Sequence, residues 1–184
     1  MHYLKSNYNS IATIVFILII VLAHLLMTSG YNIIKNTISD LGAQGYERKL
    51  IMQIGFLAFG IILSVGVFLN GISWRTTPIL VYAICVAMTG IFCTKPFFSA
   101  YTYSESQAQI HSLFAQIAGV FFTLGILAQI FYSQTNNEKW LHFLFLVLVI
   151  LFSASFAFFK SYQGICQRLL YLSSFIWLIK FYKP

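Results

Sequence analysis

The chain has 184 residues, of which 59% are hydrophobic and only 8% are charged. A soluble domain carries roughly 25% charged residues, so eleven Lys and Arg with four Asp and Glu are too few to cover a surface that faces water. This composition excludes a water-soluble enzyme, a disordered tail and a nucleic-acid-binding domain. The net charge of +7 comes from basic residues scattered singly through tails and loops, without the stripe that phosphate backbones require. We therefore expect a single integral membrane domain over residues 1–184.

Six apolar runs follow one another along the chain. A helix that crosses a bilayer needs about 20 residues, and helices satisfy their own backbone hydrogen bonds in hydrocarbon. Period-two alternation, which is typical of barrel strands, is absent. The sequence thus predicts an all-α, polytopic membrane helical bundle with six transmembrane helices. The expected spans are about 11–29, 50–70, 78–94, 109–132, 140–159 and 164–181.

An even number of spans places both termini on one side of the membrane, together with the second and fourth connections. The cations divide almost evenly between this side and the other, so the positive-inside rule does not orient the chain. Short charged tails are placed in the cytoplasm by default. We expect a multi-pass protein of a prokaryotic plasma (inner) membrane with both termini cytoplasmic.

Small side chains predict close helix contacts on two spans. Ala108, Ser112, Ala115 and Gly119 repeat at helical spacing on the fourth span, and Gly60 with Ser64 makes one such step on the second. Small residues let helix backbones approach where lipid offers no hydrophobic drive.

Polar residues in and beside the spans collect toward the side of the first, third and fifth connections. His24 lies about six residues from the end of the first span, hence ~9 Å deep at 1.5 Å per residue. An ionisable group in hydrocarbon is costly, so it normally faces the bundle interior or a wet cavity and has a partner. We therefore expect a polar pocket at one membrane face. Its candidate lining residues are His24, Ser39, Asp40, His111, Gln167 and Arg168.

Arg168 with Asp40 is the pair that we expect first, because a planar guanidinium suits a carboxylate in a half-dry site. Other interpretations stay open for each residue. Arg168 could extend to the headgroups, and His24 could be a core histidine bonded to a backbone or hydroxyl group. Asp40 follows Ser39 in a way that also suits the cap of a short helix, and His111 could be a residue of the membrane interface.

Three short motifs recur in a characteristic order. Ile38–Ala43 (Ile-Ser-Asp-Leu-Gly-Ala) follows the first span, Gln109–Ser112 (Gln-Ile-His-Ser) opens the fourth, and Gly164–Leu169 (Gly-Ile-Cys-Gln-Arg-Leu) opens the sixth. With these motifs the chain resembles an uncharacterised family of six-helix prokaryotic membrane proteins, domain of unknown function nine-nine-eight. The resemblance spans nearly the whole chain, but Phe92–Pro96 replaces the expected Phe-Pro ending of the third span. It implies no activity, and it implies that Ser39, Asp40, His111 and Arg168 share one face.

The sequence predicts a pocket that binds a lipid headgroup or a small polar ligand, in a binding or transport-related role. Arg168 would meet an anionic group, while Asp40 and His111 set orientation and protonation. Two alternatives stay open: a hydrolase-like intramembrane enzyme using His111 and Asp40, and a structural membrane subunit with no ligand.

Known catalytic motifs are missing from the sequence, which has no G-x-S-x-G, H-E-x-x-H or P-loop. The last two spans offer too few histidines for a zinc site, and a haem between His24 and His111 has little support. We expect no metal and no cofactor, membrane lipid as partner and no nucleic acid. The sequence leaves the oligomeric state open.

Overall fold

A computed structural model describes residues 2–98 and 102–184 of the chain. Within these residues it contains six α-helices, two short 3-10 helices and no strand, so the all-helical prediction is confirmed. The α-helices are α1 (His2–Leu25), α2 (Lys49–Asn70), α3 (Thr77–Ile91), α4 (Glu105–Tyr132), α5 (Asn136–Phe158) and α6 (Gln163–Lys180). The 3-10 helices are η1 (Ile38–Gly42) and η2 (Lys160–Tyr162).

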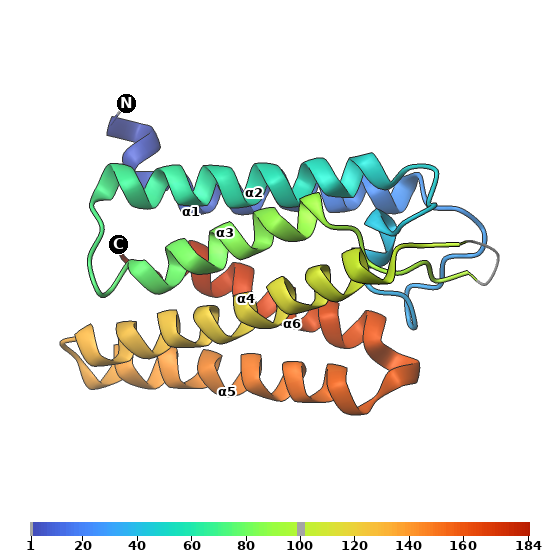
Figure 1. The fold of residues 1–184 in the computed structure, drawn as a ribbon. Helices are drawn as coiled ribbons and strands as arrows, with labels where there is room; N and C mark the ends of the chain where they lie inside the picture. Colours follow the sequence, from blue (N-terminus) through green and yellow to red (C-terminus); the bar gives the residue numbers. More distant parts are fainter. Residues whose placement is uncertain (1, 99–101) are drawn as a thin grey trace.

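The helices lie lengthwise beside one another, and the chain begins and ends at the same end of the bundle (Figure 1). We call this the terminal end. The α1–α2, α3–α4 and α5–α6 connections lie at the opposite end, which we call the loop end. Each helix packs against the next one in the chain, and α6 returns to contact α1. Phe16 of α1 closes this arrangement, with its ring 5.0 Å from that of Phe59 on α2 and 5.8 Å from that of Phe175 on α6.

Four of the helices in the described part of the chain are long and apolar enough to cross a membrane: α1 from Asn7, α2, α4 and α5. With 15 and 18 residues, α3 and α6 are about 22 and 27 Å long, somewhat less than the roughly 30 Å of hydrocarbon. Large apolar side chains also point outward, such as Leu18, Phe68 and Leu151. An outer surface of this kind suits lipid. The chain is thus built as a multi-pass membrane protein.

Two helices end earlier than their apolar runs suggest. The first ends at Leu25 and the third at Ile91, where the predicted spans reach residues 29 and 94. His24 therefore lies in the last turn of α1, next to its final residue Leu25, and not six residues inside the helix as expected. Phe92 leaves the helix with φ −92° and ψ 120°, and its carbonyl then serves His111 instead of continuing α3. A hydropathy pattern cannot show that the His111 side chain takes the Phe92 carbonyl out of the helix hydrogen bonds.

Small residues permit close helix contact on α2, but the predicted stripe on α4 makes no such contact. A Cβ at Gly60 would lie 2.4 Å from the Ala83 carbonyl oxygen of α3, so the expected close approach of the second span is confirmed there. On α4, by contrast, Ser112, Ala115 and Gly119 are exposed, and a Cβ at Gly119 would meet nothing within 4 Å. The expected contact of this stripe within the chain is wrong, because spacing alone does not tell which face of a helix meets its neighbours.

Candidate functional site at the loop end

The first turns of α6 hold the connection that follows α1. Gly164 lies directly against the backbone of this connection: a Cβ there would be 2.2 Å from the Ile33 carbonyl oxygen and 2.4 Å from that of Asn36. Only glycine permits so close an approach. We call Tyr31–Gly42 together with Gly164–Arg168 the loop–helix junction. The junction explains the glycine that opens the last of the three motifs.

Gln167 joins α6 to the start of η1. Its Oε1 accepts a hydrogen bond of 2.6 Å from the Ile38 backbone N–H, and its Nε2 donates to the Ser39 Oγ at 3.3 Å. Ile38 is buried, so its N–H needs a partner inside the protein. The structure thus brings Ser39 and Gln167 together, as the sequence interpretation expects.

Arg168 points back along α6 into a group of backbone carbonyls. Its Nη1 donates to the carbonyl oxygens of Ile33 at 2.8 Å, Asn36 at 3.0 Å and Gly164 at 2.8 Å. These acceptors belong to the connection and to the first turn of α6 itself. The planar, multiply donating guanidinium is suited to such a cluster, so Arg168 fastens the junction as well as carrying a charge.

The second guanidinium nitrogen contacts His24 and Tyr31. Arg168 Nη2 donates to His24 Nε2 at 2.7 Å and to the Tyr31 hydroxyl at 2.6 Å. Since a guanidinium only donates, His24 Nε2 carries no proton, and Nδ1 donates to the Ile20 carbonyl at 2.7 Å. His24 is therefore a neutral imidazole in a fixed tautomer. It combines the backbone bond of the core-histidine interpretation with a place in the predicted cluster.

Tyr31 connects Arg168 to the start of η1. Its hydroxyl accepts from Arg168 and donates to the Thr37 carbonyl at 2.8 Å. Burial raises the pKa of Tyr31 to about 12, and the neighbouring Arg168 charge offsets only part of this rise. The phenol consequently remains neutral at physiological pH and adds no negative charge beside the guanidinium.

Asp40 caps η1 and does not pair with Arg168, so the expected Arg168–Asp40 ion pair is wrong. The Asp40 Oδ2 accepts from the Thr37 N–H at 2.7 Å, while the Thr37 Oγ1 accepts from the Asp40 N–H at 3.1 Å. This reciprocal pair is a capping box, as the capping interpretation expects. The carboxylate serves its own helix start, and backbone carbonyls occupy the guanidinium instead.

Burial raises the pKa of the Asp40 carboxyl above its ordinary value. Hydrogen bonds from Thr37 and Asn36, and the proximity of His111, offset only part of this rise. The ionised carboxylate is therefore less favoured here than in water.

His111 belongs to α4 and is buried against the end of α3. Its Nδ1 lies 2.8 Å from the Phe92 carbonyl oxygen and 3.2 Å from that of Thr89, so this nitrogen carries the proton and donates. The hydrogen bonds of His111 go to the Thr89 and Phe92 carbonyls, and none in the described part of the chain joins it to Arg168 or Asp40. The structure thus brings together His24, Ser39, Gln167 and Arg168, while Asp40 joins through Thr37 and His111 fixes α3 to α4.

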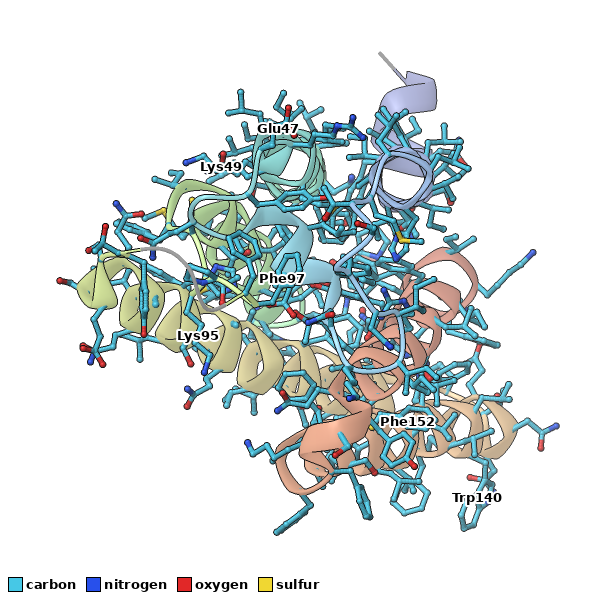
Figure 2. The ribbon with its side chains drawn as sticks, turned by 90° about the vertical axis from the view of Figure 1, so that its right-hand side faces the viewer. Glu47, Lys49, Lys95, Phe97, Trp140 and Phe152 are labelled. Carbon is cyan, nitrogen blue, oxygen red and sulfur yellow. The ribbon has the colours of Figure 1, made fainter. Side chains whose placement is uncertain are left out.

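An aromatic group covers the centre of the loop end. Figure 2 looks onto this end and shows Phe97 near the middle, between the ends of the helices. The Phe97 ring lies 5.7 Å from the rings of both Tyr31 and Tyr46. Gln44 holds the neighbouring connection through two bonds to the Ser104 backbone, of 2.8 and 2.9 Å. The junction is therefore a packed, largely hydrogen-bonded site with Arg168 half-buried at its edge.

Comparison with known proteins gives one assignment. The chain matches, over residues 10–181, the model of a family described as Protein of unknown function (DUF998). The chain belongs to the DUF998 family. The matched region contains all three motifs and the whole loop–helix junction. No curated protein and no solved structure matches the chain.

Sequence interpretation missed part of the site in this DUF998 protein. Tyr31 resembles any aromatic residue of a membrane interface, and nothing in the sequence marks its bond to Arg168. Thr37 could have been found as the N-cap three residues before Asp40. Within residues 2–98 and 102–184, no three His, Cys, Asp or Glu side chains gather in a way that could hold a metal ion.

Proposed function

We propose that the loop end of this DUF998 protein binds an anionic lipid headgroup, in a prokaryotic plasma (inner) membrane with both termini in the cytoplasm. The observation that carries the proposal is the uncompensated charge of Arg168. Among the residues that the structure describes, the one ion pair is Lys183–Glu138 at the terminal end. The side chains that bond Arg168, namely His24 and Tyr31, are neutral.

Electrostatics favours an anion beside Arg168. Carbonyl dipoles orient toward the guanidinium, but they do not cancel a full positive charge. At a half-buried position that charge is screened less than it would be in water. Exposed Lys35 and Lys160 on the flanking connections add to the positive potential. Asp40, the carboxyl-bearing residue of the junction, is engaged with Thr37 and forms no ion pair with Arg168 in the described part of the chain.

The geometry gives less support to an enzyme. His111 donates its Nδ1 proton to backbone carbonyls, and Asp40 is engaged in the cap of η1. The two form no hydrogen bond of the kind that orients a general base. The experiments below distinguish lipid binding by Arg168 from a purely structural role of this residue.

The proposal can be tested by counting the lipids retained by the purified protein in mass spectra of intact complexes. With phosphatidylglycerol, we expect Arg168→Gln to retain one lipid fewer than the wild type, because the attracting charge is gone. Lys180→Gln, which removes an exposed cation at the terminal end, should retain the wild-type number. Phosphatidylcholine should not distinguish these variants.

Arg168→Lys separates binding from fastening. Lysine keeps the charge but lacks the planar set of donors, so its melting temperature should fall while the anionic lipid is retained. A wild-type lipid count for Arg168→Gln, or an equal loss of lipid in the lysine variant, would show that Arg168 only holds the junction together.

A further inference from the structure

The terminal end contains a pocket that is separate from the loop–helix junction. It has a volume of about 150 Å³ and lies where the α2–α3 connection, the end of α4, the start of α5 and the segment after α6 meet. The residues that bear on its chemistry are Arg75, Gln129, Glu138, His142 and Lys183. The space is sufficient for several waters or one tetrahedral oxyanion.

Arg75 supplies a fixed positive charge at this pocket. Its guanidinium carbon lies 4.0 Å from the centroid of the Tyr132 ring, a cation–π contact that holds the group at the pocket wall. It also donates to an oxygen of Pro184, the last residue of the sequence. Among the residues that the structure describes, Arg75 has no side-chain carboxylate partner, since Glu138 is bonded to Lys183 at 2.6 Å. The side chains that line the pocket thus include two cations, Arg75 and Lys183, and one carboxylate, Glu138.

His142 supplies an oriented hydrogen-bond donor. It is 4% exposed, and its Nδ1 lies 3.0 Å from the Trp177 Nε1. An indole N–H only donates, so Nδ1 is the acceptor and the proton of the neutral ring is on Nε2. Trp177 therefore leaves the Nε2–H available to a ligand. Gln129 holds the segment after α6 against the pocket by donating a hydrogen bond to the Lys183 carbonyl at 2.9 Å.

We propose that this pocket binds a phosphate-type oxyanion, either as inorganic phosphate or as the phosphate of a lipid headgroup. A guanidinium, an ammonium and an imidazole N–H line one space, and the single side-chain carboxylate there is already paired with Lys183. This set of donors suits the several oxygens of a phosphate. The proposal does not depend on Arg168, because the pocket lies at the opposite end of the bundle.

The direct test is flow dialysis of the full-length protein in detergent with radiolabelled inorganic phosphate. We expect saturable binding that Arg75→Gln weakens about tenfold or more, the usual effect of losing a hydrogen bond to a charged group. Lys180→Gln is the matched control, since it removes a cation near the same end that does not line the pocket.

A second measurement locates the ligand. With Trp74 and Trp140 replaced by phenylalanine, the fluorescence of Trp177 reports on its neighbour His142, and it should change on titration with phosphate. If the natural source is a lipid, phosphatidylglycerol vesicles will show the Arg75 dependence and inorganic phosphate will not. Failure of Arg75→Gln to weaken the binding of either probe would overturn the proposal while leaving the loop-end proposal to its own test.

Discussion

The Asp40 carboxyl lies at the start of η1, where it accepts the Thr37 N–H and is largely removed from water. Because its pKa is raised, the Asp40 carboxyl binds a proton more tightly in the folded state than in the unfolded state. An unfolded aspartate has a pKa of about 3.9, so folded and unfolded chains differ in bound protons just above that value. The difference contributes to stability at acidic pH and is lost as the pH rises through the folded-state pKa.

Asp40→Asn should therefore flatten the dependence of the melting temperature on pH. The amide keeps an acceptor for Thr37 but does not ionise, so the wild-type contribution that declines with rising pH disappears. Thermal unfolding between about pH 4 and pH 7 checks this. Asp40→Ala is the control: relative to the asparagine variant it is expected to cost about 1 kcal/mol at every pH through loss of the cap. Parallel profiles for the wild type and the asparagine variant would contradict the expectation.

Single residues also mark the limit of sequence interpretation at this site. Sequence interpretation could single out Gly164, Gln167 and Arg168, because the residue type itself indicates the role of each. The carbonyls of Ile33 and Asn36 could not be singled out, because every residue has a carbonyl and only the folded backbone decides which ones face a cation. The same limit explains the incorrect pairing of Arg168 with Asp40.

At the scale of elements, α6 and the connection after α1 approach each other most closely at Gly164, where the helix lies directly against backbone. A Cβ on Gly164 would overlap the carbonyl oxygens of the connection, which in turn bind Arg168. One added methyl group would thus displace the atoms that hold the guanidinium.

Gly164→Ala should destabilise the protein by about 1–3 kcal/mol, the usual range for inserting an atom into a packed site. Gly119→Ala on α4 is the matched control, because a Cβ there meets nothing within 4 Å and alanine favours a helix. Chemical or thermal unfolding in detergent measures both. Equal stability of the two variants would mean that the connection yields without cost.

The helices themselves were largely predictable. In lipid each span must satisfy its own backbone, so long apolar runs determine where helices form. Their ends were less predictable: α1 begins at His2 and α4 at Glu105, within polar sequence that hydropathy leaves outside the spans. The outward face of α4 was missed for a different reason, since small residues favour close contact without identifying the partner.

At the scale of the whole molecule, the connections and the termini separate to opposite ends of the bundle (Figure 1). Tyr103, before α4, and Asn136, at the start of α5, are both exposed and lie at opposite ends. All three native cysteines are buried and free. A cysteine introduced at either position can therefore be labelled without background from the native thiols, and each position reports on one side of the membrane.

Tyr103→Cys and Asn136→Cys should react with a membrane-impermeant maleimide from opposite sides. With cytoplasmic termini, Tyr103→Cys is labelled in intact cells and Asn136→Cys only after the membrane is opened. The wild type, with its buried thiols, is the control for background. Labelling of both variants in intact cells would be inconsistent with four complete passages between residue 1 and the α4–α5 connection.

The loop–helix junction joins residues that are far apart in the chain: the bonds from Arg168 to Ile33, Asn36 and Tyr31 span 132 to 137 positions. During synthesis the connection emerges first, and its partner Arg168 follows 132 residues after Asn36. Until then, the carbonyls that surround Arg168 in the native protein lack their cation. A nascent chain interrupted before the sixth helix would leave these carbonyls without their native partner.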